Sequence, residues 1–184
     1  MLAGEPFRRI RILCVLFLLI SAVPIVAQST AQMPTIEGES LSGSKVVLPE
    51  AAKGKVATLI FGFTRASKEA TKAWADKIFA DFDSRPGFAL YQLPVLEAVP
   101  GFIRGMVVSS MKKGVRENMR KNFVPILHHE AELKKLVSFK EPDDAYLVVL
   151  DRSGQIVHQQ RGPFSDAAYA QLKGKIEPLF SSPK

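Results

Sequence analysis

The feature that most restricts the fold of this chain is an unbroken run of mostly apolar residues, KVATLIFGF, at residues 55–63. The run lacks the alternation of apolar and polar residues that a strand with one solvent-facing side has. It therefore predicts a strand buried on both faces at the centre of a sheet. The 184-residue chain, with 47% hydrophobic residues, is large enough to bury one such core, so we expect a single domain with an appendage.

A helical pattern follows this strand directly. Apolar side chains recur at spacings of three and four between Ala70 and Phe82, which predicts a helix over residues 67–83 with Trp74 in the core. Thr64 or Ser67 is available to cap the start of this helix.

Strands and helices then alternate to the end of the chain. Helices between strands allow parallel pairing, and a final hairpin adds an antiparallel edge. The order predicts an α/β fold of three layers, with a central mixed sheet and flanking helices. The predicted elements are a strand at 88–96 whose pairing ends at Pro94, a helix at 102–121, a short strand at 124–128, a short helix at 130–138, a hairpin at 145–162 that turns at Asp151–Gly154, and a helix at 165–180.

The N-terminus has the pattern of a secretory signal peptide. Arginines at positions 8, 9 and 11 precede the uncharged stretch ILCVLFLLISAVPIVA at 12–27, and small residues follow at Ala27 and Ala31. This stretch is shorter than the ~20 residues that a spanning helix needs. We expect a signal peptide at 1–27, cleaved after Ala27 or Ala31, and an exported protein, periplasmic or otherwise extracytoplasmic. An uncleaved N-terminal membrane anchor is the alternative.

The remaining chain is expected to divide in two, a polar lead-in with a short hairpin at 28–50 and the folded domain at 51–184. The only cysteine, Cys14, lies in the apolar stretch and would leave with it. The mature chain would then have no disulfide, no thiolate nucleophile and no cysteine-ligated metal.

The basic excess is concentrated in one segment. Without residues 1–27 the chain has 22 basic and 17 acidic side chains, a net charge of +5. Residues 104–121 hold six basic side chains and one acidic side chain, so this segment accounts for the whole excess. The high pI therefore indicates a local patch and does not indicate binding to nucleic acid.

Two stretches resemble the thioredoxin-like superfamily. SLSGSKVVLPEAAKGKVATLIFGFT is similar to the entry of its exported, peroxiredoxin-like branch, and AYLVVLDRSGQIVHQQRGPFSDAAYAQL is similar to the closing hairpin and helix. The resemblance covers residues 40–180 and implies a thioredoxin-like fold. It says nothing about activity.

Two departures from this superfamily fall at the redox site. The turn that would hold paired cysteines reads TRASK at residues 64–68, and a serine hydroxyl is too weakly acidic for disulfide exchange. The position of the cis-proline holds Ala145, where we expect an ordinary trans bond. Both departures argue for a redox-inactive protein that is not an enzyme. A thioredoxin-fold oxidoreductase or peroxidase-like enzyme with non-cysteine chemistry is the alternative.

A narrower resemblance links FALYQLPVLEAVPGFIRGMVVSSMKKGVRENMRKNFVPILHH to the mitochondrial ATP synthase assembly chaperone family and its bacterial relatives. The shared features are a strand that ends in Leu93 and Pro94, the Phe102–Met106 entry to a helix, and His128 after a basic segment. Members of that family bind a membrane subunit and are not enzymes. The resemblance therefore implies a binding or assembly role without a cofactor. The partner it implies is a protein, and a membrane protein is one candidate.

The helix predicted at 102–121 is the most informative segment for function. Met106 or Val107 begins an apolar stripe that recurs nearly every four residues to Phe123, with basic side chains in other directions. The stripe either packs on the sheet or forms an interface with a protein or an anionic membrane surface, and periodicity does not separate these readings. The partner-binding candidates are Arg65, Lys68, Arg104, Lys112, Lys113, Arg116, Arg120 and His128.

No catalytic, cofactor or metal site is predicted. The adjacent histidines at 128–129 diverge on either a strand or a helix, which is poor geometry for one metal. Arg65 and Lys68 are expected near the aspartates at 143–144. There, a salt bridge that replaces the redox site is favoured over an anion or partner site.

Overall fold

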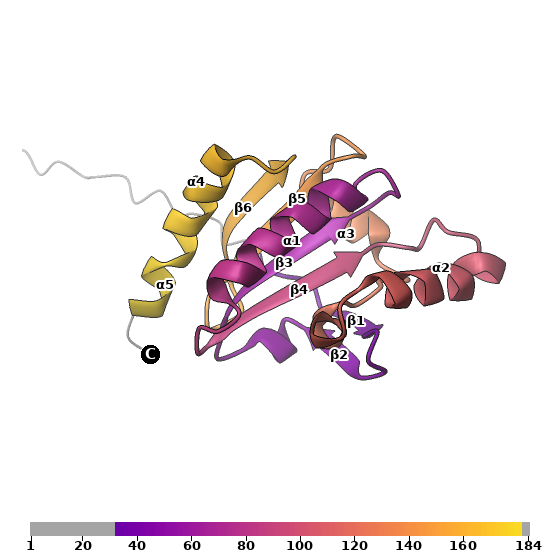
Figure 1. Ribbon diagram of the computed structural model, residues 1–184, viewed down its shortest axis with the longest axis horizontal. Coiled ribbons are helices and arrows are strands. Elements are labelled where there is room, and N and C mark those ends of the chain that lie inside the picture. Colours follow the sequence, from indigo (N-terminus) through magenta and orange to yellow (C-terminus); the bar gives the residue numbers. More distant parts are fainter. Residues whose placement is uncertain (1–31, 182–184) are drawn as a thin grey trace, which may run out of the picture.

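A four-stranded sheet lies at the centre of the computed structural model, which describes residues 32–181 and leaves the predicted signal peptide outside (Figure 1). The strand order is β4-β3-β5-β6. Strand β3 (Val56–Gly62) pairs in parallel with β4 (Phe88–Pro94) and antiparallel with β5 (Ala145–Leu150), and β5 pairs antiparallel with β6 (Ile156–Gly162). Every residue of β3 is buried, which confirms the predicted central strand.

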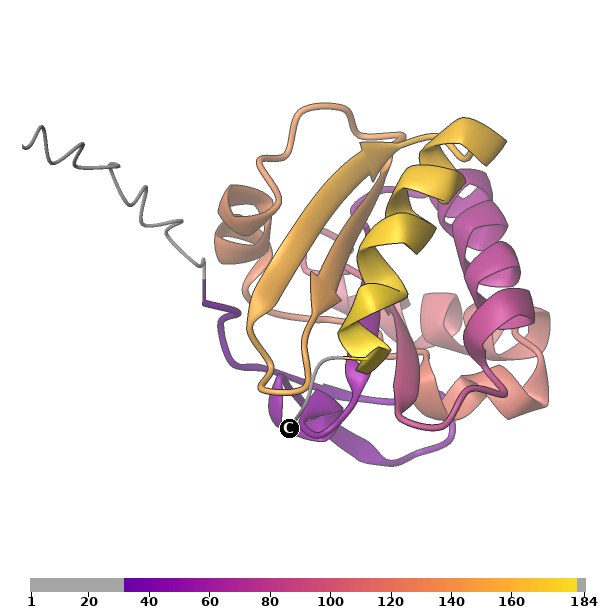
Figure 2. The same ribbon diagram turned by 90° about the vertical axis from the view of Figure 1, so that its left-hand side faces the viewer.

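Helices cover one face of this sheet. They are α1 (Lys68–Phe82), α4 (Asp166–Ile176) and the short α5 (Pro178–Ser181), seen together in Figure 2. Trp74 of α1 is fully buried, and its indole Nε1–H donates a hydrogen bond of 3.0 Å to the carbonyl of Gly162. The prediction that Trp74 belongs to the core is confirmed.

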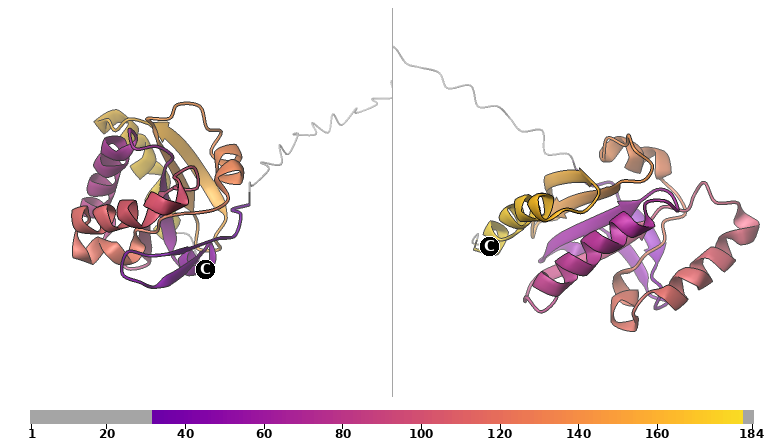
Figure 3. Two further views of the ribbon diagram at one scale, coloured as in Figure 1. Left: turned by 90° about the vertical axis from the view of Figure 1, so that its right-hand side faces the viewer. Right: turned by 45° about the horizontal axis from the view of Figure 1, so that its top comes forward.

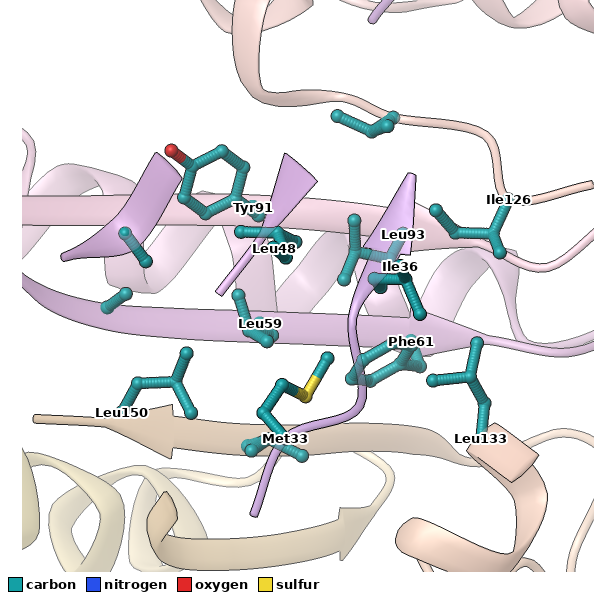
Figure 4. Packing of buried hydrophobic residues seen from close by; sticks show 14 of the residues in the cluster. Met33, Ile36, Leu48, Leu59, Phe61, Tyr91, Leu93, Ile126, Leu133 and Leu150 are labelled. Atoms are coloured by element: carbon teal, nitrogen blue, oxygen red, sulfur yellow. The ribbon is translucent and has the colours of Figure 1, made fainter. Parts of the chain in front are cut away.

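The opposite face is covered by the antiparallel hairpin of β1 (Ile36–Glu39) and β2 (Lys45–Leu48), the 3-10 turn η1 (Glu50–Ala52), and α3 (Glu130–Leu136). Apolar side chains from the hairpin and from Met33 pack onto β3 (Figure 4). The residues just before position 51 are thus part of the same core. The sheet has a covering layer on each side, so the predicted three-layer α/β architecture is confirmed.

The basic segment departs from its prediction. Helix α2 (Gly101–Gly114) ends at Gly114, the next two residues are extended, and the 3-10 helix η2 (Glu117–Asn122) follows. A single helix over 102–121 is therefore wrong. Glycine costs a helix about 1 kcal/mol relative to alanine, and the break lets Met119 of η2 turn into the core beside α1. A tertiary contact outweighs continuation of the helix.

The strand predicted at 124–128 is also wrong in extent. This segment makes two isolated parallel bridges beside β4, from Phe123 to Gln92 and from Ile126 to Val95. The N–H groups of Val124 and Ile126 donate to the carbonyls of Gln92 and Pro94, but Pro94 of β4 has no N–H to donate in return, so a continuous ladder cannot form.

The β5–β6 hairpin turns where the sequence predicts. One carboxylate oxygen of Asp151 accepts hydrogen bonds from the backbone N–H groups of Ser153 and Gln155, both at 2.9 Å. Gly154 has a φ of +85°, a backbone region that glycine adopts without steric cost.

Asp81, near the end of α1, joins that helix to α4. Its carboxylate accepts a hydrogen bond of 2.7 Å from the Tyr169 hydroxyl and lies 3.0 Å from the ammonium of Lys77 and 3.4 Å from that of Lys173. The hydrogen bond from Tyr169 and the neighbouring Lys77 lower the pKa of Asp81. Burial and the same carboxylate raise the pKa of Tyr169.

Asp81→Asn is expected to lower the free energy of unfolding at pH 7 by about 1 kcal/mol, because the charge-assisted hydrogen bonds become neutral ones. A carboxylate whose pKa is depressed by folding contributes stability above its unfolded pKa, and this stability is lost as the pH falls through the folded value. Urea unfolding from pH 7 to pH 2 should therefore show the wild type and Asp81→Asn converging at the acid end. Asp83→Asn, on an exposed carboxylate, is the matched control, and a difference that persists at pH 2 would contradict the assignment.

Trp74→Phe removes the buried donor to Gly162 and leaves space beside Phe164, whose ring centroid lies 5.3 Å from that of Trp74. We expect a loss of about 2–3 kcal/mol in unfolding free energy, from the lost hydrogen bond and the smaller side chain. Because Trp74 is the only tryptophan, urea unfolding should be followed by circular dichroism. Val157→Ala, on the exposed side of β6, should change stability by less than about 0.5 kcal/mol.

Candidate functional site

The turn between β3 and α1, where paired cysteines would stand, is closed by hydroxyl groups. The Thr64 hydroxyl oxygen accepts hydrogen bonds from the backbone N–H groups of Ala66 (3.2 Å) and Ser67 (3.3 Å). The Ser67 hydroxyl donates to the Thr64 carbonyl at 2.9 Å, and Ser67 is buried. Gly62 allows this close packing, because a Cβ there would lie 2.7 Å from Ser67 Oγ. Thr64 therefore satisfies the backbone donors that precede α1.

Thr64 also joins this turn to the loop before β5. Its hydroxyl donates a hydrogen bond of 2.8 Å to the carbonyl of Pro142. The bond before Ala145 is trans, as predicted, while the Leu48–Pro49 bond elsewhere is cis. The two segments that would form a redox site thus lie side by side and are held together by a hydroxyl group.

The salt bridge expected at this place is wrong in its partners. Asp144 pairs with Arg161 of β6 at 3.2 Å instead of with a residue of the turn. Lys68 lies 3.7 Å from the carboxylate of Glu69, and both side chains are well exposed. Among residues 32–181, Arg65 and Lys68 therefore make no ion pair with the loop before β5. They remain candidates for contact with a partner.

Helix α2 is the second candidate region, and none of its residues is buried. It extends beyond the end of β4 at the margin of the molecule (Figures 1 and 3). Its inward side, with Ile103, Val107 and Met111, is half-buried. The apolar stripe that begins at Val107 faces inward, with Met119 buried, Val115 packed against the core, and Val107, Met111 and Phe123 half-buried, whereas Met106 is exposed.

The opposite side of this helix carries apolar and basic side chains together. We define the outward face of α2 as Phe102, Met106, Ser109, Lys112 and Lys113, which are all exposed. Phe102 is 90% exposed and Met106 is 74% exposed. Their spacing of four residues places them one turn apart on one side. The sequence prediction placed Phe102 only in a helix-entry motif, although its spacing from Met106 was already visible.

The arginines of the basic segment at 104–121 make contacts within the fold. Arg104 donates to the backbone carbonyls of Val99 and Glu97, each at 2.7 Å. Arg116 pairs with Asp76 of α1 at 2.8 Å, and Arg120 donates to a backbone carbonyl at 3.1 Å. These contacts fix the two ends of α2 and the start of η2.

The lysines differ from these arginines. Lys112 and Lys113 are exposed, and within residues 32–181 neither forms an ion pair or a side-chain hydrogen bond. Helix α2 itself contains no aspartate or glutamate. Within the described part of the chain, the predicted cationic patch is thus reduced to a smaller set of free lysines, which are Lys112 and Lys113 at the C-terminal end of α2 and Lys121 in η2.

His128 is exposed in the loop before α3. The neighbouring His129 Nδ1 is 3.3 Å from the carboxylate of Glu132. Across the described part of the chain, no group of three or more His, Cys, Asp or Glu side chains is placed to hold a metal ion. Nor does any helix within residues 32–181 combine the length and hydropathy needed to cross a bilayer.

The sequence matches no family model and no curated protein, but solved structures with similar folds exist. The thiol:disulfide interchange protein DsbE from Chlorobium tepidum aligns over 80% of this chain and 94% of its own, with a TM-score of 0.56 and 16% identity. The pneumococcal exposed lipoprotein thioredoxin Etrx1, from Streptococcus pneumoniae, aligns over 77% and 99%, with a TM-score of 0.54 and 16% identity.

BsSco, a member of the Sco family of cytochrome c oxidase assembly proteins, aligns over 82% of this chain and 95% of its own, with a TM-score of 0.56 and 11% identity. These similarities show that the chain has the thioredoxin-like fold predicted from its sequence.

The turn at Thr64 predicts a measurable property of an introduced thiol. In a Cys14→Ser background, Thr64→Cys places sulfur where two backbone N–H groups converge at the start of α1. We expect its pKa to fall below the ordinary ~8.5, because these donors and the helix dipole stabilise the thiolate. The pH dependence of alkylation by iodoacetamide measures this pKa. Ser84→Cys in the loop after α1 is the control, and equal values for the two thiols would contradict the geometry.

Proposed function

We propose that the protein is an exported, redox-inactive thioredoxin-like protein that acts as a binding or assembly module near a membrane. One observation carries this proposal. The turn that presents a reactive thiolate in disulfide chemistry here holds Thr64 and Ser67, which hydrogen-bond each other, and the Thr64 hydroxyl also donates to the Pro142 carbonyl in the adjacent loop. Both hydroxyl groups are engaged in hydrogen bonds within the domain.

The free surface of the domain supports a role in binding. The outward face of α2 presents two exposed apolar side chains and two unpaired lysines, while nearby arginines are engaged internally. Apolar surface left uncovered next to free charge is typical of a contact region. Arg65 and Lys68 add a second exposed cationic pair at the start of α1.

Two similar structures are consistent with such a role outside the cytoplasm. One is described as an exposed lipoprotein thioredoxin, and another belongs to a family of cytochrome c oxidase assembly proteins. Thioredoxin-like scaffolds thus occur in assembly proteins as well as in oxidoreductases. The N-terminal arginines and the apolar stretch at 12–27 support export of this chain.

Enzyme assays test the proposal directly. We expect the full chain to show no turnover in insulin reduction with dithiothreitol and no consumption of hydrogen peroxide, with a thioredoxin and a peroxiredoxin as positive controls. The same assays on Cys14→Ser exclude a contribution from the only thiol. Turnover that persists in Cys14→Ser would favour the alternative, an oxidoreductase or peroxidase-like enzyme with non-cysteine chemistry.

A further inference from the structure

The two most exposed large apolar side chains of the described chain lie next to each other on a convex surface. Within residues 32–181, the exposed large apolar residues are Phe102, Met106 and Val157, and the first two are one helical turn apart on α2. Gly101 and Gly105 flank them, and a Cβ built on either glycine meets no atom within 4 Å. The two side chains therefore project freely from the helix.

Charge is distributed unevenly along the same helix. Lys112 and Lys113 occupy its C-terminal end, they have no ion-pair partner in the described chain, and α2 has no acidic residue. At a rise of 1.5 Å per residue, Phe102 and Lys113 are separated by about 16 Å along the axis. One end of the outward face of α2 is thus apolar, and the other is cationic.

We propose that the outward face of α2 docks on the surface of an anionic lipid bilayer, with Phe102 and Met106 at the acyl boundary and Lys112 and Lys113 against lipid phosphates. A bilayer offers an apolar layer beneath a plane of negative charge, and interfacial helices place their apolar side ~5–10 Å below the headgroups. A tilted α2 meets both layers at once. The inference rests on the proposed function, to which it adds the surface and the chemistry of its partner.

Charge complementarity favours lipid over a protein surface. A convex helix side with two protruding apolar residues needs no shaped groove in its partner, and a bilayer provides none. The lysine ammonium acts as a point charge and suits a diffuse plane of negative charge such as a lipid surface, whereas a fixed bidentate carboxylate or phosphate site would favour arginine. In this segment the arginines are committed to the fold and the free cations are lysines.

A label on the helix tests this docking in the full chain. In Cys14→Ser, Ser109→Cys carries an environment-sensitive fluorophore on the outward face of α2. The chain is reconstituted into phosphatidylcholine vesicles with or without phosphatidylglycerol, so that any insertion of residues 12–27 is common to both samples. We expect a blue-shifted emission that grows with the phosphatidylglycerol fraction and reverses at high salt.

Variants separate the apolar and cationic contributions. Each lysine near an anionic surface contributes about fivefold to binding, so Lys112→Gln with Lys113→Gln should weaken docking about 25-fold. Phe102→Ser with Met106→Ser should weaken it about tenfold or more. Lys135→Gln with Lys175→Gln, on exposed lysines of other helices, is the matched control and should leave docking unchanged. Circular dichroism and urea midpoints verify that all variants fold.

Three results would overturn the proposal. The first is an equal emission in vesicles with and without phosphatidylglycerol, or docking that survives the Lys112 and Lys113 changes. The second is a concentration-dependent shift without vesicles, which would assign the face to a second copy of the chain. The third is a shift that occurs only with native membranes and is lost when those membranes are treated with protease, which would assign it to a protein. None of these results alters the insulin and peroxide assays, so failure here is distinguishable from failure of the proposed function.

Discussion

The burial of β3 on both faces is the constraint on which the rest of the structure depends. Its seven residues have no access to solvent, so each face needs a cover, which α1 and α4 provide on one side and the β1–β2 hairpin with α3 on the other. The cost of this arrangement is visible at Thr58, whose buried hydroxyl has no hydrogen-bond partner among residues 32–181. An unmet hydroxyl costs about 1–3 kcal/mol, which the two apolar layers around it outweigh.

The turn between β3 and α1 keeps the backbone arrangement expected of a thiol site, but its side chain is the hydroxyl of Thr64. The N–H groups at the start of α1 still converge on one side-chain oxygen, that of Thr64. The adjacent loop still meets that side chain, through the carbonyl of Pro142. The Thr64 hydroxyl accepts hydrogen bonds from the N–H groups before α1 and links them to the loop before β5, and a hydroxyl does not undergo disulfide exchange. Thr64 therefore stabilises the junction between the start of α1 and the loop before β5.

Local sequence patterns were sufficient to predict the elements whose structure is decided by neighbouring residues. The central strand, α1 with Trp74, and the β5–β6 turn follow from apolar periodicity and turn chemistry, and all three are confirmed. The break after Gly114 did not follow, because burial of Met119 against α1 decides it. The spacing of apolar residues in a sequence is the same whether or not one of them, such as Met119, packs against an element that is distant in sequence.

The candidate site was less predictable, because charges acquire partners only through the register of the sheet. Arg161 reaches Asp144 because β6 lies antiparallel to β5, and this pairing displaced the one expected with Arg65. The basic segment likewise read as one uniform patch. The structure divides it into arginines that hold backbone and α1, and lysines that hold nothing within the described chain.

The contacts that hold α2 at its two ends have a consequence for how the domain is oriented when the helix binds a partner. At one end Arg104 grips the carbonyls of the preceding loop, and that loop is hydrogen-bonded to the start of α3 through Glu97 and Glu130. At the other end Arg116 is tied to α1. These contacts orient α2 relative to the sheet, so a surface that binds the helix would also set the direction in which the Thr64 turn faces. Helix α2 would then set the orientation of the domain on its partner as well as provide the binding surface.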